Sequence, residues 1–150
     1  ALSINKNAAE PNVNLGLIAL PSGDTKTAES YIAKGTSANN YDEALGQLYI
    51  AQGKYSQATA KLADSYTNSA ALASIMNKDY AKAKVILNSI KNADATTYYL
   101  AAVLGARTNS SSEVKSNLQK AIAADKSYIK KAATDAEFNK YAEVVAAIAK

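Results

Sequence analysis

Cysteine, histidine and tryptophan are all absent from this chain of 150 residues. Without cysteine, the chain can form neither a disulfide nor a thiolate nucleophile nor a cysteine-ligated zinc site. Without histidine, it lacks the side chain that most often transfers protons near neutral pH and most often binds metals. Only 6 Gly and 2 Pro are present, too few for an all-β domain that turns about every ten residues.

Sequence motifs of catalysis are missing as well. A Ser–His–Asp arrangement needs a base that this chain does not have. A Ser–Lys pair such as Ser116 and Lys120 is expected on the solvent-facing side of a helix, where the lysine stays protonated and inert. No D-x-D-x-D-G calcium loop and no G-x-x-x-x-G-K-[ST] phosphate loop occurs. We therefore expect a protein that is not an enzyme and that binds no metal or cofactor.

The positive charge is spread along the chain rather than concentrated. Lys and Arg total 17 against 13 Asp and Glu, and the single arginine is Arg107. The densest basic cluster is Lys126, Lys130 and Lys131 beside Tyr128. Nucleic-acid-binding proteins usually show clustered Arg and Lys with interleaved aromatic residues. We expect a solvated helix face and no nucleic-acid partner, with a phosphate-binding patch as the alternative.

Long apolar stretches are also absent. No run approaches the roughly 18 uninterrupted apolar residues of a membrane-spanning helix, so we expect no direct membrane insertion. Residues 1–6 contain no Met, no basic region and no long apolar run, which is not the pattern of a signal peptide. Both a complete short protein and a processed piece of a longer one fit this beginning.

The sequence is rich in alanine, which favours helices, and residues 45–62 have the pattern of helix, turn, helix. Gly53 stands where the end of a helix needs a residue in the left-handed conformation. The small residues Gly46 and Ala58 are expected to let the two helices approach closely. Apolar residues recur at helical spacing on both sides of the turn: Leu45, Leu48, Tyr49 and Leu62.

This arrangement occurs three more times along the chain. An earlier copy has Gly16 and Ala28 at the separation of Gly46 and Ala58. A third copy turns at 77–80 and a fourth at 108–112. The offsets between successive copies are 30, about 25 and about 31 residues, and such self-similarity is typical of helical repeat proteins.

These residues resemble the tetratricopeptide repeat, a helix-turn-helix unit of about 34 residues. The resemblance covers about 9–128 and lacks the Trp and Pro of the family pattern. It implies an all-α fold, a right-handed α-solenoid of stacked antiparallel helix pairs with about nine or ten helices. We expect 1–150 to form one such domain, with about four shortened repeats followed by capping helices over 127–149.

The expected helices follow from periodicity and capping residues. Asp94 and Ser111 or Ser112 are expected to cap helix starts, as is Ser37 or Asn39. The segment 134–137, with Asp135 and Glu137, has the pattern of a cap followed by an acidic first turn. The expected helices span about 8–20, 24–34, 40–52, 55–65, 69–76, 79–91, 94–107, 111–124 and 127–133, with a last one reaching 149. The apolar side of the last helix consists of Phe138, Tyr141, Val144, Val145 and Ile148.

Family members typically hold peptides or proteins on a concave face lined by the first helix of each pair, so the resemblance implies a non-catalytic interaction scaffold. Helical phase gives the candidate partner-binding residues: Asn40, Glu43, Gln47, Asn68, Tyr99, Val103 and Arg107. Because Glu43 would oppose an anion, we do not expect recognition of an acidic C-terminal tail. Other residues expected on this mixed polar and apolar face, such as Leu72, could instead belong to the core.

Two further interpretations concern context. The alternative function is a structural spacer or assembly module of a larger bacterial envelope protein, with other domains of a longer chain as partners. The absence of cysteine and the excess of Lys over Arg favour the periplasm or cell envelope of a bacterium. A bacterial cytoplasmic scaffold is the other possibility.

Overall fold

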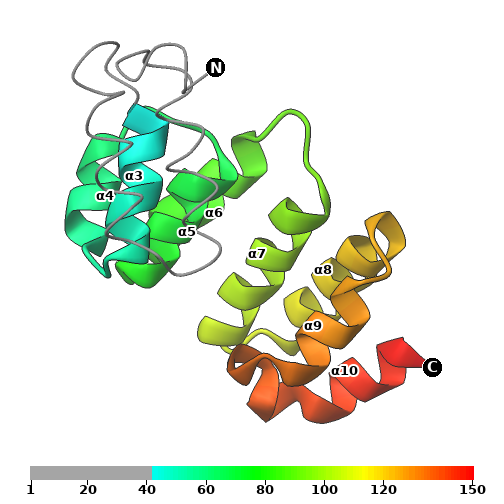
Figure 1. Ribbon diagram of the computed structural model, residues 1–150. Coiled ribbons are helices and arrows are strands. Elements are labelled where there is room, and N and C mark those ends of the chain that lie inside the picture. Colours follow the sequence, from blue (N-terminus) through cyan, green and yellow to red (C-terminus); the bar gives the residue numbers. More distant parts are fainter. Residues whose placement is uncertain (1–41) are drawn as a thin grey trace, which may run out of the picture. The chain divides into compact units, whose positions relative to one another are not determined.

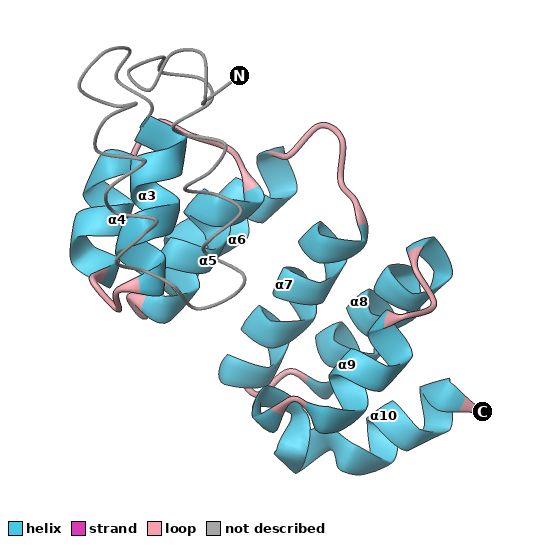
Figure 2. Cartoon of the chain, viewed as in Figure 1, coloured by secondary structure: helices cyan, strands magenta, loops and turns pink. Residues whose placement is uncertain are grey.

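The computed structural model describes residues 42–150, and all its regular elements in this range are helical (Figure 2). They are α3 (Asp42–Ala51), α4 (Tyr55–Lys61), α5 (Asn68–Met76), α6 (Tyr80–Ser89), α7 (Ala95–Arg107), α8 (Ser111–Ala124), α9 (Tyr128–Thr134), the 3-10 helix η2 (Ala136–Tyr141) and α10 (Ala142–Ala149). The all-α class is therefore confirmed for this part of the chain. The helices expected at 8–20 and 24–34, and the caps Ser37 and Asn39, lie outside the described residues.

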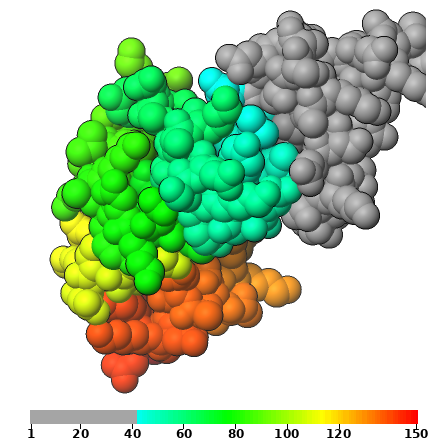
Figure 3. Space-filling view, turned by 90° about the vertical axis from the view of Figure 1, so that its left-hand side faces the viewer, coloured from blue at the N-terminus to red at the C-terminus, as the bar shows by residue number. Residues whose placement is uncertain are grey.

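The chain divides into two compact units, Ala1–Ser65 and Tyr66–Lys150. Of the first unit, the structure describes the hairpin of α3 and α4. The second unit contains α5 to α10, and in the space-filling view its residues form a continuous surface on the face shown (Figure 3). The expectation of one repeat domain over 1–150 stays a prediction.

The same backbone turn joins α3 to α4, α5 to α6 and α7 to α8. In each turn one residue has a positive φ, namely Gly53 (73°), Lys78 (64°) and Asn109 (59°). The next residue donates its N–H to a carbonyl five residues earlier: Lys54 to Tyr49 at 2.8 Å, Asp79 to Ser74 at 2.9 Å and Ser110 to Gly105 at 2.8 Å. This is the bond pattern by which a left-handed residue ends a helix. The left-handed conformation expected for Gly53 is thus confirmed, and the second and third turns adopt it without glycine.

Burial repeats in register with these turns. Five residues after the positive-φ residue lies a fully buried small or β-branched side chain, and nine residues after it lies a buried leucine. The first set is Ala58, Ala83 and Val114, and the second set is Leu62, Leu87 and Leu118. Each second helix therefore presents the same apolar positions to its hairpin partner, which is why three segments of different sequence form similar hairpins.

Glycines allow close approach inside two hairpins. A Cβ added to Gly46 would lie 2.5 Å from Cγ of Leu62, so the α3 backbone lies directly against this leucine. The expected close packing at Gly46 is present, but the nearest atoms belong to Leu62 rather than to Ala58, because Leu62 lies one turn further along α4 and has a longer side chain. In the other hairpin, a Cβ on Gly105 would lie 3.1 Å from the backbone nitrogen of Val114.

In the second unit, neighbouring hairpins pack in chain order. Helix α5 contacts α6 and also α7, and α7 contacts α8 (Figure 1). Helices α9 and α10 both contact α8, while η2 lies against α7. The first helices of successive pairs, α5 and α7, are thus direct neighbours. The α9–η2 segment comes later in the sequence and contacts α7 through η2.

Two details of the expected helices differ in the structure. The last helix does not run unbroken to Ala149, because residues 136–141 form the tighter 3-10 helix η2 before α10 begins. In a 3-10 helix, side chains three residues apart align, and Phe138 and Tyr141 are both buried. The N-cap position of α8 is Ser110 rather than Ser111 or Ser112, since the turn ends one residue earlier, and its side chain makes no capping hydrogen bond.

We predict that Gly46→Ala destabilises the chain by about 1–3 kcal/mol, the usual cost of overpacking. The added Cβ would overlap Leu62, which is only 1% exposed and cannot move aside easily. The measurement is urea unfolding followed by circular dichroism.

The double variant Gly46→Ala/Leu62→Ala is the control. Removing the leucine makes room for the new Cβ, so the double variant should be no less stable than Leu62→Ala alone. If the destabilisation of the double variant equals the sum of the two single effects, the close approach of Gly46 to Leu62 is not the reason why Gly46→Ala destabilises the chain.

Candidate functional site

A groove of about 450 Å³ opens on the second unit along the first helices of its hairpins. Helix α5 contributes Asn68, Ser69, Leu72 and Met76, and α7 contributes Thr96, Tyr99, Leu100 and Val103. The α9–η2 segment closes the third side with Lys131, Asp135 and Glu137. The groove therefore has an apolar floor between two helices and charged groups along one edge.

The near ends of α5 and α7 are fixed by a polar network at their N-termini. Asp94 caps α7 by accepting from the N–H of Thr97 at 2.9 Å, and Thr97 Oγ1 accepts from the N–H of Asp94 at 3.0 Å. Asn68, at the start of α5, donates to Asp94 Oδ1 at 3.1 Å and accepts from Thr97 Oγ1 at 2.8 Å. The expected cap Asp94 is confirmed, and it also ties the two helices together.

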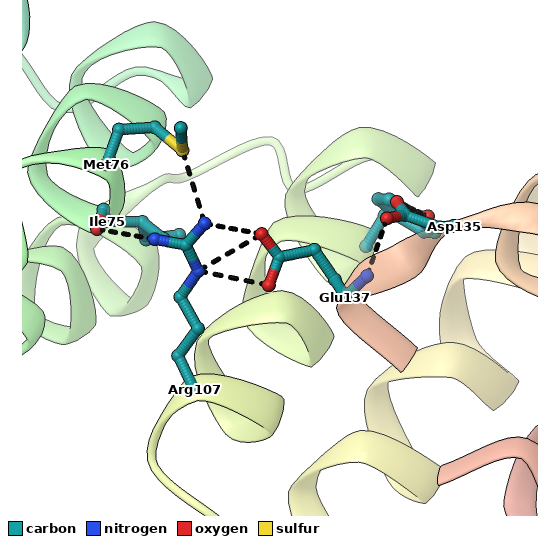
Figure 4. A network of polar contacts seen from close by, with 6 residues as sticks. Ile75, Met76, Arg107, Asp135 and Glu137 are labelled. Atoms are coloured by element: carbon teal, nitrogen blue, oxygen red, sulfur yellow. Dashed lines mark hydrogen bonds and ion pairs between the residues drawn. The ribbon is translucent and has the colours of Figure 1, made fainter. Parts of the chain in front are cut away.

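The far ends of α5 and α7 are held by Arg107 (Figure 4). Its Nε donates to both carboxylate oxygens of Glu137, at 3.1 and 3.0 Å, and Nη2 makes a further short contact with Oε1. Its Nη1 donates to the carbonyl of Ile75 at 3.3 Å, and Nη2 lies 3.5 Å from the sulfur of Met76. One guanidinium group thus joins the end of α5, the end of α7 and η2.

An aromatic cluster lies on the α9 side of the groove, which its member Tyr99 lines. The Tyr99 ring packs against Tyr128, with centroids 5.1 Å apart, and edge-on against Phe138 at 5.5 Å. The Tyr99 hydroxyl donates to Oδ2 of Asp135, whose Oδ1 accepts from the N–H of Glu137 at 3.0 Å. Asp135 therefore caps η2, within the segment 134–137 that is expected to begin a helix, and at the same time fixes the Tyr99 ring.

Three ionisable groups of this region have shifted pKa values. Burial, together with the hydrogen bond to Asp135, raises the pKa of Tyr99 far above its ordinary value, so the hydroxyl stays protonated. Hydrogen bonds to Glu137 raise the pKa of Arg107 against the opposing effect of burial. The backbone N–H of Thr97 lowers the pKa of Asp94, and desolvation opposes this shift.

The structure brings some of the expected site residues together. Asn68, Tyr99 and Val103 line the groove, but Tyr99 and Val103 are only 5% and 6% exposed, so they form its floor. Arg107 lies at the end of the groove, bound to Glu137. Whether these residues contact a partner stays a prediction.

The remaining expected site residues lie outside this groove. Glu43 and Gln47 belong to α3 of the first unit, where Gln47 Nε2 donates to Glu43 Oε1 at 3.3 Å. Asn40 lies outside the described residues.

Lys131, Asp135 and Glu137 line the groove although sequence reasoning assigned them other roles. The sequence predicts the capped, acidic start of a helix at Asp135 and Glu137, and a solvated helix face at Lys131. The repeat offset could have identified two of the three. Tyr99 lies 31 residues after Asn68, and Val103 lies 31 residues after Leu72. A further step of 32 residues leads from Tyr99 to Lys131 and from Val103 to Asp135.

The part of the chain that the structure describes holds no cluster of three or more acidic residues able to bind a metal ion. Within the same range, no helix has the length and apolar character needed to cross a membrane. Comparison with protein-family models, curated proteins and solved structures finds no match to this chain. The functional argument therefore depends on the groove itself.

We predict that Arg107 and Glu137 are energetically coupled by about 1–2 kcal/mol, because their bidentate pair is partly shielded from solvent. A double-mutant cycle with Arg107→Met and Glu137→Gln, followed by urea unfolding, measures this coupling.

The pair Lys84 and Glu113 is the matched control. It also joins residues about thirty positions apart, at 3.2 Å, but its side chains are 61% and 39% exposed. Its coupling should stay below about 0.5 kcal/mol. Equal coupling in the two cycles would show that Arg107 is an ordinary surface contact.

We also predict that Asp94→Asn removes an acid-sensitive part of the stability. Because the folded-state pKa of Asp94 is lowered, the carboxylate stabilises the fold above its unfolded pKa. That contribution is lost as pH falls through the folded-state value. Asn caps helices about as well as Asp but does not titrate.

The measurement compares urea unfolding of wild type and Asp94→Asn between pH 6 and pH 2. The difference between the two proteins should shrink as the pH falls. A difference that is constant with pH contradicts the assigned role of Asp94.

Proposed function

We propose that this protein is a non-catalytic scaffold that binds a peptide or protein segment in the groove between α5, α7 and the α9–η2 segment. In this proposal the hairpins belong to a solenoid of tetratricopeptide-like repeats, and the groove is part of its concave face. The shared turn, the repeated buried positions and the contact of α5 with α7 support the solenoid.

The observation that carries the proposal is the groove itself. A volume of about 450 Å³ is within the range of roughly 300–1,000 Å³ that is usual for ligand pockets. Leu72 and Met76 are half-buried in its wall, so apolar atoms remain available to a guest side chain.

The walls of the groove are also preorganised. The Asn68–Asp94–Thr97 network fixes one end and the Arg107–Glu137 pair fixes the other. A surface whose helices are already held in place loses little conformational entropy when a partner binds.

The alternative, a spacer or assembly module, is favoured by a different observation. Asn68 and Arg107, two polar residues expected to bind a partner, use their side chains for contacts within the chain. In a pure spacer, the groove would result from helix packing and would need no guest.

We predict that Leu72→Lys strongly weakens peptide binding without unfolding the protein. The experiment selects peptides from a displayed random library on wild type and then measures their affinities by fluorescence polarisation. Because a charged group would stand on the apolar wall, affinity should fall by about tenfold or more.

The matched control is Val85→Lys, since Val85 is 59% exposed on α6 and does not line the groove. It should leave the affinities unchanged. If no peptide is selected, or if the selected peptides bind Leu72→Lys as well as wild type, the groove is not a binding site and the spacer function is favoured.

A further inference from the structure

Lys131 holds its ammonium group over two aromatic rings of the groove edge. Its Nζ lies 5.0 Å from the Tyr99 centroid and 5.2 Å from the Tyr128 centroid. The two rings are tilted by 53° to each other, so their faces converge on one position. Among the described residues, no carboxylate lies within ion-pair distance of this ammonium group. The ammonium group of Lys131 therefore interacts with the two ring faces through cation–π contacts.

The charges beside this position favour a cation. Glu137 is neutralised by Arg107, whereas Asp135 accepts hydrogen bonds from Tyr99 and from the Glu137 N–H and makes no ion pair among the described residues. A carboxylate and two ring faces on one edge of a groove match an ammonium or guanidinium group. An acidic guest would be repelled by Asp135 at the same place.

Lys131 is suited to being displaced. Its side chain is exposed, so the ammonium group can rotate toward the solvent at little cost. Lys131 makes no side-chain hydrogen bond among the described residues. The Tyr128 ring would remain in position, because its hydroxyl lies 2.8 Å from Thr96 Oγ1 on α7. The Tyr99 ring is held by Asp135 and Phe138.

We propose that the groove recognises a peptide segment with a basic side chain, whose cationic group replaces Lys131 over Tyr99 and Tyr128 beside Asp135. Apolar side chains next to that basic residue would contact Leu72 and Leu100. This inference rests on the proposed function and specifies the partner chemistry. Arginine fits best, because its planar guanidinium stacks on aromatic faces and is more weakly hydrated than an ammonium group.

The test uses three capped peptides of seven residues, built from leucine and serine around a central position. The central residue is Arg, norleucine or Glu, and the peptides are otherwise identical. Binding to the full chain is measured by NMR titration of the isotope-labelled protein. The Arg peptide should bind most tightly, and the Glu peptide should bind most weakly. The norleucine peptide has an apolar stem without the charge, so it isolates the cationic contribution.

Lys131→Met should tighten binding of the Arg peptide by about two- to fivefold, because the competing ammonium group is removed from the rings. Lys130→Met is the matched control. It removes one positive charge from the neighbouring, exposed residue, whose ammonium group does not lie over the Tyr99 or Tyr128 ring. It should change the affinity much less.

The ring itself is tested with Tyr128→Phe and Tyr128→Leu. Phenylalanine keeps the aromatic face and loses only the hydrogen bond to Thr96, so most of the affinity should remain, whereas leucine removes the face and should weaken binding of the Arg peptide by about two- to fivefold. If Tyr128→Leu loses its helical circular dichroism, the comparison of Lys131→Met with Lys130→Met decides the question.

Equal affinity for the Arg and norleucine peptides would overturn this inference. So would equal effects of Lys131→Met and Lys130→Met. A third outcome is that the Arg peptide does not bind, while binding of the library-selected peptides is still weakened by Leu72→Lys. That outcome overturns the preference for a basic side chain but not the proposed binding function of the groove. If no peptide of either kind binds, the proposed function is overturned too.

Discussion

The guanidinium group of Arg107 holds three elements of the second unit together. It lies at the end of α7, yet its partners are the last residues of α5 and a carboxylate of η2, about thirty residues away in either direction. Because the group is planar and carries several donors in a fixed arrangement, it can satisfy a carboxylate and a helix-terminal carbonyl at the same time. The carbonyl of Ile75 lies in the last turn of α5, where it also accepts from the N–H of Lys78 at 3.0 Å.

The second constraint is the repeated helical hairpin. Each hairpin ends its first helix on a left-handed residue, and this geometry fixes where the second helix begins. The apolar side chains five and nine residues later then face the first helix. Lys78 and Asn109 show that the constraint lies in the backbone, since neither is glycine but both have the conformation of Gly53.

The groove follows from these two constraints. In the second unit, α5 and α7 contact each other directly, and tethers at both ends keep them at a fixed separation. The site on its edge has a different origin, because Tyr99, Tyr128 and Asp135 come from three elements and meet only after α9 and η2 fold onto α7. A basic residue of the same chain occupies that site, which is why charge and aromatic contacts together indicate what kind of partner would fit there.

The sequence by itself determined the class, the hairpin turns and the helices of the described range apart from the start of the last one, because these depend on local rules. Alanine and apolar spacing set the helices, Asp94 and Asp135 set two of their starts, and Gly53 set a turn. It also indicated Asn68, Tyr99 and Val103 as one surface, since helical phase and the repeat offset can both be found in the sequence.

Only the tertiary structure decided what these residues contact. Tyr99 is buried because Phe138 and Tyr128 pack against it, and Asn68 and Arg107 are engaged within the chain because their partners arrive from other helices. The expected last helix begins as a 3-10 segment, where Phe138 and Tyr141 enter the core, and continues as α10. Contacts between residues thirty positions apart depend on how helices pack, and no local pattern of residues specifies that packing.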